Sequence, residues 1–151
     1  MYTRFLLIFL SSVALLAAGK KKDKTDRGPA FDPNHIEVSI RYMEPLRWSP
    51  RSVAYGYSLA IDGDSVRVYL PYMGVAHQPN MDSDGLDFEK PLTSMRQIAG
   101  KKGRTQLIFS CQKGIVEYWF KLTIYPNGKA FLRLSPSNAD AIDYEGELTG
   151  G

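Results

Sequence analysis

The sequence has few of the residues that form disulfide bonds, bind metals or act as nucleophiles. Cys111 is the one cysteine among 151 residues, so no intramolecular disulfide can form and the fold must be stabilised by its core. Cys111 stands in step with Leu107 and Phe109, which favours a buried structural thiol over a nucleophile. The two histidines, His35 and His77, are far apart in the sequence. With one buried thiol they are poorly suited to a zinc site, which needs three or four ligands.

A large excess of charge of one sign is also missing from the body of the chain. The net charge of +3 arises from the segment Lys20–Arg27, in which basic residues outnumber acidic ones and apolar residues are absent. From Gly28 onward, 13 Lys and Arg stand against 14 Asp and Glu. The bulk charge therefore gives no argument for a nucleic-acid partner. We interpret residues 20–28 as a charged flexible linker, whose association with a membrane would be peripheral at most.

Long apolar runs are absent except near the N-terminus. There, Arg4 precedes the apolar or small run Phe5–Leu16, and Ala17-Ala18-Gly19 follows it. This pattern predicts a secretory signal peptide over residues 1–19, because the run is shorter than the roughly 20 residues that cross a bilayer. An uncleaved membrane anchor is the less favoured alternative. We expect a periplasmic or secreted protein that is not lipidated, because Gly19 stands where the lipidated cysteine would be required.

Alternation of apolar and polar residues predicts a single all-β domain over residues 29–151. Apolar residues recur at every second position in several segments, which is typical of half-buried strands. These segments are 36–42, 57–61, 66–70, 107–111, 116–124 and 130–134. We predict an antiparallel meander of about seven to nine strands that forms a small barrel or a sandwich. Leu86–Phe88 is predicted as a short strand, and Thr93–Ile98 as a possible helical turn.

The hairpin over Tyr57–Leu70 has a turn that can be derived from its register. A two-residue II′ loop at Gly63-Asp64 pairs Ile61 with Val66 and keeps the apolar residues on one face. A I′ loop at Asp62-Gly63 would also keep them on one face, so it remains an alternative. We favour the first register.

The last long hairpin also has a derivable turn. Ile124 must lie opposite Ala130 for the apolar residues of both strands to share a face. This register predicts a three-residue loop, 126–128, with its glycine in the left-handed conformation. The same register places aromatic side chains on the outer face, namely Trp119, Tyr125 and Phe131. They would form a binding surface, unless a second layer or the N-terminal segment covers them.

The residues after Leu70 predict a stop in the sheet. Pro71 cannot donate a ladder hydrogen bond, and Gly74 tolerates the left-handed conformation, so the strand should end and turn there. Tyr72 is expected to lie over the end of the sheet and to offer its hydroxyl to a partner. The loop that follows contains His77, a second candidate ligand-binding residue near this end.

Two weaker patterns also fall within residues 75–89. Oxygen ligands occupy the first, third and fifth positions of an EF-hand-like loop, at Asn80, Asp82 and Asp84. Pro91 stands at the twelfth position, where a bidentate Glu is needed, so calcium is a minor alternative and no other cofactor is expected. A hydrolase using Ser83, His77 and Asp82 is also disfavoured, because neighbours in one loop rarely form a catalytic triad. We assign no catalytic residue.

Several blocks of the sequence together resemble a known family. They are Y-S-L-A-I-D-G-D-S-V-R-V-Y-L-P-Y-M-G from Tyr57, L-D-F-E from Leu86, Y-W-F-K-L-T-I-Y-P-N-G-K-A-F-L-R-L from Tyr118, and I-D-Y-E-G-E-L from Ile142. Residues 36–148 are similar to an uncharacterised family of exported Bacteroidetes proteins known as domain of unknown function 4251. The resemblance implies a periplasmic or outer-membrane-associated all-β domain with no assigned activity. The chain departs from the family at Gly19, where many relatives carry the lipidation cysteine, and over residues 75–84.

These observations together predict a binding or interaction module of the cell envelope, with no enzymatic activity expected. Its partner would be a peptide, a glycan or an envelope protein. The candidate ligand-binding residues are Tyr72, His77, Trp119, Tyr125 and Phe131. A small hydrolase that uses the 75–89 loop and a calcium-stabilised β-domain remain the alternatives.

Overall fold

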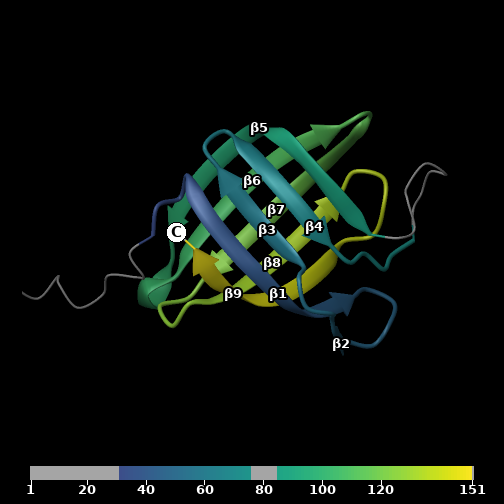
Figure 1. The fold of residues 1–151 in the computed structure, drawn as a ribbon, viewed down its shortest axis with the longest axis horizontal. Helices are drawn as coiled ribbons and strands as arrows, with labels where there is room; N and C mark the ends of the chain where they lie inside the picture. Colours follow the sequence, from purple (N-terminus) through teal and green to yellow (C-terminus); the bar gives the residue numbers. More distant parts are fainter. Residues whose placement is uncertain (1–30, 76–84, 151) are drawn as a thin grey trace, which may run out of the picture.

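The computed structural model describes residues 31–75 and 85–150 (Figure 1). The expected signal peptide and charged linker, residues 1–28, lie outside the described residues. The described chain forms nine strands and one short 3-10 helix, η2, over Lys101–Gly103. The strands are β1 His35–Pro45, β2 Arg51–Ser52, β3 Ser58–Asp62, β4 Ser65–Leu70, β5 Leu86–Ala99, β6 Thr105–Lys113, β7 Val116–Ile124, β8 Lys129–Pro136 and β9 Ile142–Gly150.

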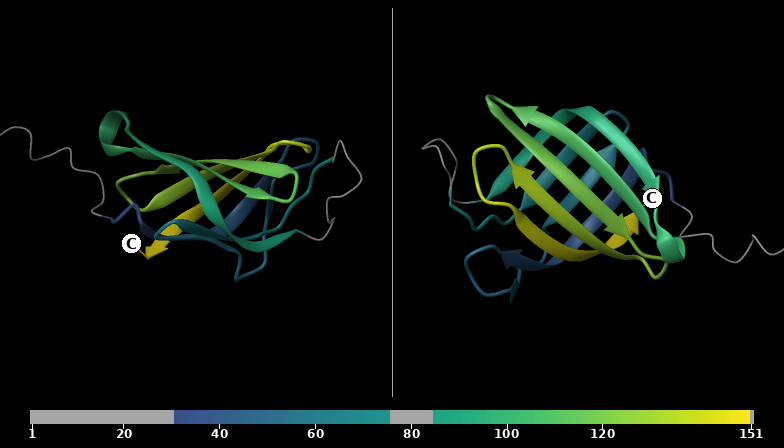
Figure 2. Two further views of the ribbon diagram at one scale, coloured as in Figure 1. Left: turned by 90° about the horizontal axis from the view of Figure 1, so that it is seen from above. Right: turned by 180° about the vertical axis from the view of Figure 1, so that it is seen from behind.

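The strands form one antiparallel sheet that closes into a barrel. Strands β3 to β9 follow one another as a meander, and β1 pairs with β3 on one side and with β9 on the other. The two-residue β2 pairs with Tyr42 and Met43, near the C-terminal end of β1, and lies outside the closed ring. Strands on the near and far sides of the barrel cross in Figures 1 and 2, as the tilt of a small closed barrel requires. The predicted all-β meander is confirmed, and of its two predicted forms the barrel is the one observed.

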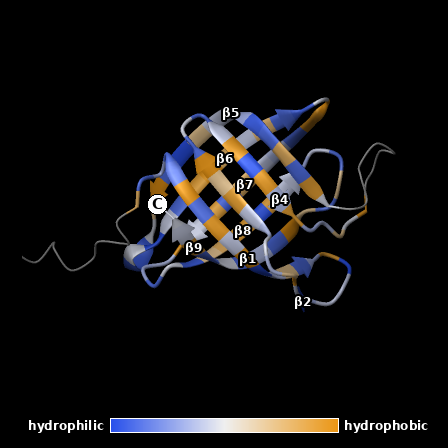
Figure 3. Cartoon of the chain, viewed as in Figure 1, coloured by the Kyte–Doolittle hydropathy of each residue, from blue (hydrophilic) through white to orange (hydrophobic). Residues whose placement is uncertain are grey.

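Side chains fill the interior of the barrel. The alternation along each strand sends every second residue inward, and Figure 3 shows the resulting bands of apolar and polar residues across the strands. The largest fully buried side chains come from β1, β3, β4, β6, β7, β8 and β9, and include Tyr144, Phe109, Phe120, Ile40, Leu59, Leu70, Leu122 and Leu134. Cys111 lies among them, and burial raises the pKa of its thiol to about 11. The thiol therefore stays protonated and inert at neutral pH.

Both turns derived from register have the expected form. Ile61 pairs with Val66, and Gly63 has a φ of +64°, as the first position of a II′ turn requires. In the last long hairpin, Ile124 pairs with Ala130. The loop between them closes with a hydrogen bond of 2.9 Å from the Gly128 amide to the Tyr125 carbonyl oxygen, and Gly128 has a φ of +85°.

The prediction of a helical turn over Thr93–Ile98 is wrong, because these residues belong to the 14-residue strand β5. Leu86–Phe88 is likewise only the start of that strand. Its ladder with β6 contains an irregularity between Leu92 and Ser94, and on either side of it Leu92 pairs with Cys111 and Met95 with Phe109. An extra residue at this β-bulge shifts the alternation by one position. Leu92 and Met95, which both lie on the inner face of the sheet, therefore stand three positions apart, a spacing that is also typical of one face of a helix.

Closure of the barrel depends on a close approach of β9 to β1. Gly146 pairs with Ile40, and the register between the two strands shifts between Ile40 and Tyr42. A Cβ atom built on Gly146 would collide with the Ser39 carbonyl oxygen. Only glycine can therefore occupy this position without moving the backbone of one of the two closing strands.

We expect Gly146→Ala to lower the free energy of unfolding by roughly 1–3 kcal/mol or more, because the new methyl group must displace backbone rather than a side chain. Thermal and chemical unfolding measure this change. Gly150→Ala is the matched control, since a Cβ there would stand 3.5 Å from the Glu37 side chain, an ordinary contact. If the two variants are equally stable, the backbones of the two closing strands can move apart at Gly146 at little cost, and the prediction is wrong.

Candidate functional site

The outer face of β7, β8, β9 and β1 carries two neighbouring rows of side chains that run across the strands. One row alternates between aromatic and polar residues, and consists of Thr123, Phe131, Glu145 and Tyr42. The other consists of charged residues, Lys121, Arg133, Asp143 and Glu44. The opposed pairs in each ladder fix both rows, because directly opposed residues lie on the same side of a sheet.

Phe131 is the aromatic centre of this surface. Its ring meets the Tyr125 ring edge-on, with centroids 5.5 Å apart, and the Arg104 guanidinium lies 5.1 Å from the centroid of Tyr125. Tyr125 is thus held between a cation and a second ring, an arrangement that fixes its orientation. Phe131 remains 40% exposed, so its ring is available to a ligand.

Two hollows adjoin Phe131, and we refer to them together as the Phe131 groove. One has a volume of about 290 Å³ and the other about 330 Å³. The first is lined by Glu44, Lys121, Thr123, Tyr125, Phe131, Leu132, Arg133, Asp143, Tyr144 and Glu145. The second is lined by Arg41, Tyr42, Lys129, Ala130, Phe131, Glu145, Gly146 and Glu147. Phe131 and Glu145 belong to both, so one elongated ligand can contact the two hollows at once.

Several charged groups of the groove are available to a ligand. Arg133 pairs with Asp143 at 3.7 Å, a weak exposed contact. Within residues 31–75 and 85–150, Lys121, Glu44 and Glu145 take part in no ion pair. The groove therefore offers ring faces together with both hydrogen-bond donors and acceptors.

Trp119 lies on the same outer face but outside the groove. It pairs with Ser135 and Ser110 and is 43% exposed, and it lines neither of the two hollows. The structure therefore brings together Tyr125 and Phe131 of the predicted aromatic surface, and separates Trp119 from them. The positions of Tyr42 and Glu145 could not be predicted from the register of the hairpins, because the pairing of β1 with β9 joins strands that are far apart in the sequence.

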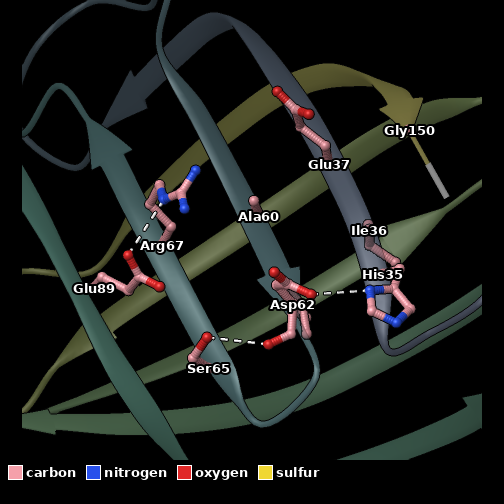
Figure 4. Close-up of a pocket in the computed structure, with 10 residues that line it drawn as sticks. His35, Ile36, Glu37, Ala60, Asp62, Ser65, Arg67, Glu89 and Gly150 are labelled. Carbon is pink, nitrogen blue, oxygen red and sulfur yellow. Dashed lines mark hydrogen bonds and ion pairs between the residues drawn. The ribbon is translucent and has the colours of Figure 1, made fainter.

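A further hollow, of about 330 Å³, lies on the outer face of β1, β3 and β4 (Figure 4). Its charged side chains pair mainly with one another. His35 lies 3.0 Å from Asp62, and Arg67 lies 3.5 Å from Glu89. Such exposed pairs contribute about 0–1 kcal/mol each and leave little charge uncompensated. This hollow is thus less suited to binding a ligand than the Phe131 groove.

Tyr72 closes one end of the barrel through Asp140. The Tyr72 hydroxyl donates to the Asp140 backbone carbonyl at 2.8 Å, and the Tyr144 hydroxyl donates to the Pro71 carbonyl at 2.6 Å. The buried Asp140 carboxylate accepts hydrogen bonds from Arg47 Nε at 2.9 Å and from the Val75 amide at 3.0 Å. These partners offset the cost of burying a carboxylate. Tyr72 thus lies over the end of the sheet as predicted, and its hydroxyl binds the protein itself.

The tyrosines at this end are held in their neutral form. Burial, assisted by the charges of Asp140 and Tyr118, raises the pKa of Tyr72 from 10.0 to about 12. Burial, assisted by Tyr72, raises the pKa of Tyr144 well above 10.0. Arg47 keeps its charge, because its hydrogen bond and ion pair with Asp140 raise its pKa above the ordinary value. The end is therefore a structural lock, which we call the Tyr72–Asp140 lock.

Gly74 does not use the left-handed conformation that a glycine there would tolerate. Gly74 is not among the glycines with positive φ. Glycine is needed there because a Cβ atom would overlap the Tyr72 hydroxyl and its ring. Turn chemistry favours glycine at this position for another reason, whereas the contact between Tyr72 and Gly74 depends on the hydrogen bond with which Asp140 holds the Tyr72 ring.

The remaining candidates, His77, Asn80, Asp82 and Asp84, lie outside the described residues, as does the Ser83 of the hydrolase alternative. In the described part of the chain, no three His, Cys, Asp or Glu side chains gather closely enough to hold a metal ion. No helix in that part is long and apolar enough to cross a membrane.

These features define a small, filled antiparallel β-barrel with a groove on its outer face. The chain belongs to the family described as Domain of unknown function (DUF4251), whose sequence profile matches residues 22–148. It resembles the crystal structure of a DUF4251 family protein from Bacteroides eggerthii DSM 20697, with a TM-score of 0.61 and 15% identity, over 76% of this chain and 78% of that chain. At this identity the likeness shows the fold alone. No curated protein matches the chain.

We expect Gly74→Ala to lower the free energy of unfolding by roughly 1–3 kcal/mol, because the new methyl group forces the Tyr72 ring away from Asp140. In a Tyr72→Ala background the same substitution should cost much less, so a double-mutant cycle measured by chemical unfolding should show strong coupling. If the effects of the two substitutions on the free energy of unfolding are additive, the requirement for glycine at position 74 does not depend on the Tyr72 ring.

The Tyr72–Asp140 lock should also weaken at alkaline pH. Tyrosines in the unfolded chain ionise near pH 10, whereas folded Tyr72 holds its proton to about pH 12. The unfolded state therefore binds fewer protons in this window, and stability should fall as the pH rises from about 10 towards 12. Melting temperatures across this range should fall less steeply for Tyr72→Phe than for the wild type. Tyr55→Phe is the control, since Tyr55 is 88% exposed and should leave the slope unchanged.

Proposed function

We propose that this protein is an exported, non-enzymatic binding module of the cell envelope, and that it binds a glycan in the Phe131 groove. What supports export is the pattern of residues 1–19, with Arg4, a short apolar run and small residues before the expected cleavage site. The groove is open, and its charged side chains are exposed or half-buried. Such a surface suits binding better than catalysis, which relies on groups that are shielded from water.

The observation that carries the proposal is the exposed Phe131 ring between two hollows whose Lys121, Glu44 and Glu145 form no ion pair within the described residues. Because side chains fill the barrel interior, a ligand must bind on the outside. Ligand sites typically combine apolar and aromatic surface with a few polar groups that fix orientation. The Phe131 groove offers this combination on the outer face of four strands.

A glycan suits this surface better than a peptide. Strands β7, β8 and β9 each have a paired neighbour on both sides, so their backbone groups are already used in the sheet. A peptide could not add there as a further strand. A sugar ring presents an apolar face that can stack on Phe131 and Tyr125, and its hydroxyl groups can bond to Lys121, Glu145 and Glu44.

We expect Phe131→Ala to weaken binding of a bacterial envelope polysaccharide roughly tenfold or more, because hot-spot aromatic side chains carry a large share of binding energy. A glycan array with the full chain identifies the polysaccharide, and titration calorimetry measures the loss. Trp119→Ala is the matched control, since Trp119 is an exposed aromatic residue on the same face that lies outside the groove.

If Trp119→Ala weakens binding and Phe131→Ala does not, the glycan binds outside the Phe131 groove and the proposed site is wrong. An array on which the full chain binds no glycan would overturn the glycan proposal. Unfolding curves of both variants must match the wild type, because Phe131 packs against Tyr125.

A further inference from the structure

The second half of β5 has an open edge. β5 pairs with β4 over Leu86–Pro91 and with β6 over Leu92–Ala99. Residues 94–99 thus have a strand neighbour on one side only, as far as the described residues extend. The left view of Figure 2 shows the η2 end of the β5–β6 hairpin projecting beyond the rest of the barrel. An open edge presents unpaired backbone donors and acceptors, which other proteins cover or exploit.

The hairpin geometry identifies which backbone groups face this edge. The Gly100 amide donates to the Arg104 carbonyl at 2.7 Å, so Gly100 faces β6. Residues of an antiparallel strand face their partner alternately. Ile98, Arg96 and Ser94 therefore also face β6. The amide and carbonyl groups of Met95, Gln97 and Ala99 point towards the open edge, and all three residues are exposed.

The same hairpin concentrates the positive charge of the domain. Of the 13 basic residues from Gly28 onward, six lie between Lys90 and Val116, a stretch with no Asp or Glu. The rest of the chain from Gly28 onward contains the other seven basic residues and all 14 acidic residues. Around the open edge the basic residues are exposed, namely Arg96, Lys101, Lys102 and Arg104. Lys102, at the tip, has a φ of +60°, an uncommon conformation for a residue other than glycine.

We propose that the open edge of β5 over residues 94–99 binds an extended acidic polypeptide segment, which adds to the sheet as a further antiparallel strand. The free amides and carbonyls of Met95, Gln97 and Ala99 would supply main-chain hydrogen bonds. The basic side chains select for acidic residues and repel the same edge of a second copy, because two such hairpins would bring like charges together. This proposal is independent of the Phe131 groove.

The alternation of side chains specifies the sequence pattern of the partner. In an antiparallel pair, residues that face each other through their backbones lie on the same side of the sheet. Partner residues that bond to Met95 and Gln97 thus lie on the inner face, beside the exposed Met95 side chain, where apolar residues fit. The residues between them lie on the outer face beside Arg96, where acidic residues fit.

The test uses the full chain and a short fluorescein-labelled peptide in which Glu and Val alternate. Fluorescence anisotropy should show that this peptide binds, and that a control peptide in which Lys and Val alternate does not. N-methylation of the Val amides should weaken binding at least about tenfold, because those amides face β5, whereas N-methylation of the Glu amides should have little effect. The two methylated peptides have the same charge and composition, so attraction by charge alone predicts equal binding.

Equal affinity of the two methylated peptides, or a greater loss from methylation of Glu, would overturn antiparallel addition to β5. On the protein side, Gln97→Pro removes an edge-facing amide and leaves the β6 ladder intact, so it should weaken binding by a similar factor. Arg51→Glu, which changes an exposed basic residue of β2, a strand that pairs with β1 alone among the described strands, should bind as the wild type does. If Gln97→Pro fails to fold, the methylated peptides still decide the question.

Discussion

The pairing of β1 with β9 is the contact on which the rest of the barrel depends. It joins the first and last strands of the described chain and turns an open meander into a closed ring. Closure covers the long edges that two outer strands of an open sheet would leave unpaired. It also places Tyr42 beside Glu145, which completes the Phe131 groove. The close approach at Gly146 shows how little space this contact leaves.

Local patterns made much of the fold predictable. The II′ turn at Gly63-Asp64 and the three-residue turn that ends at Gly128 follow from alternation and from the residues of the turns themselves. The outward position of Tyr125 and Phe131 follows from the same registers. Each of these predictions depends on residues that are close in sequence, where the period of a strand and the chemistry of a turn act together.

Features that depend on distant residues could not be predicted. The bulge after Leu92 shifts the alternation of β5, and Pro91 beside it does not show that the strand continues with one extra residue, so Thr93–Ile98 resembled a helix. Asp140 contacts Arg47, which is 93 residues earlier in the chain, and Tyr72, which is 68 residues earlier, and no local motif predicts these contacts. The near balance of charge from Gly28 onward also concealed a basic hairpin on an acidic body, because a total carries no information about position.

The closed ring also has a consequence for the order in which the chain can fold. The hairpins from β3 to β8 join neighbours in sequence, so each can form as soon as its own residues are available. β1 is the first described strand and pairs with β9, whose residues are made after those of the other described strands. Until β9 pairs with β1, one edge of β1 is unpaired and the barrel stays open, so it cannot exclude water from its core. A chain that carries only β1 to β8 therefore cannot close the barrel, and its core residues stay in contact with water until β9 pairs with β1.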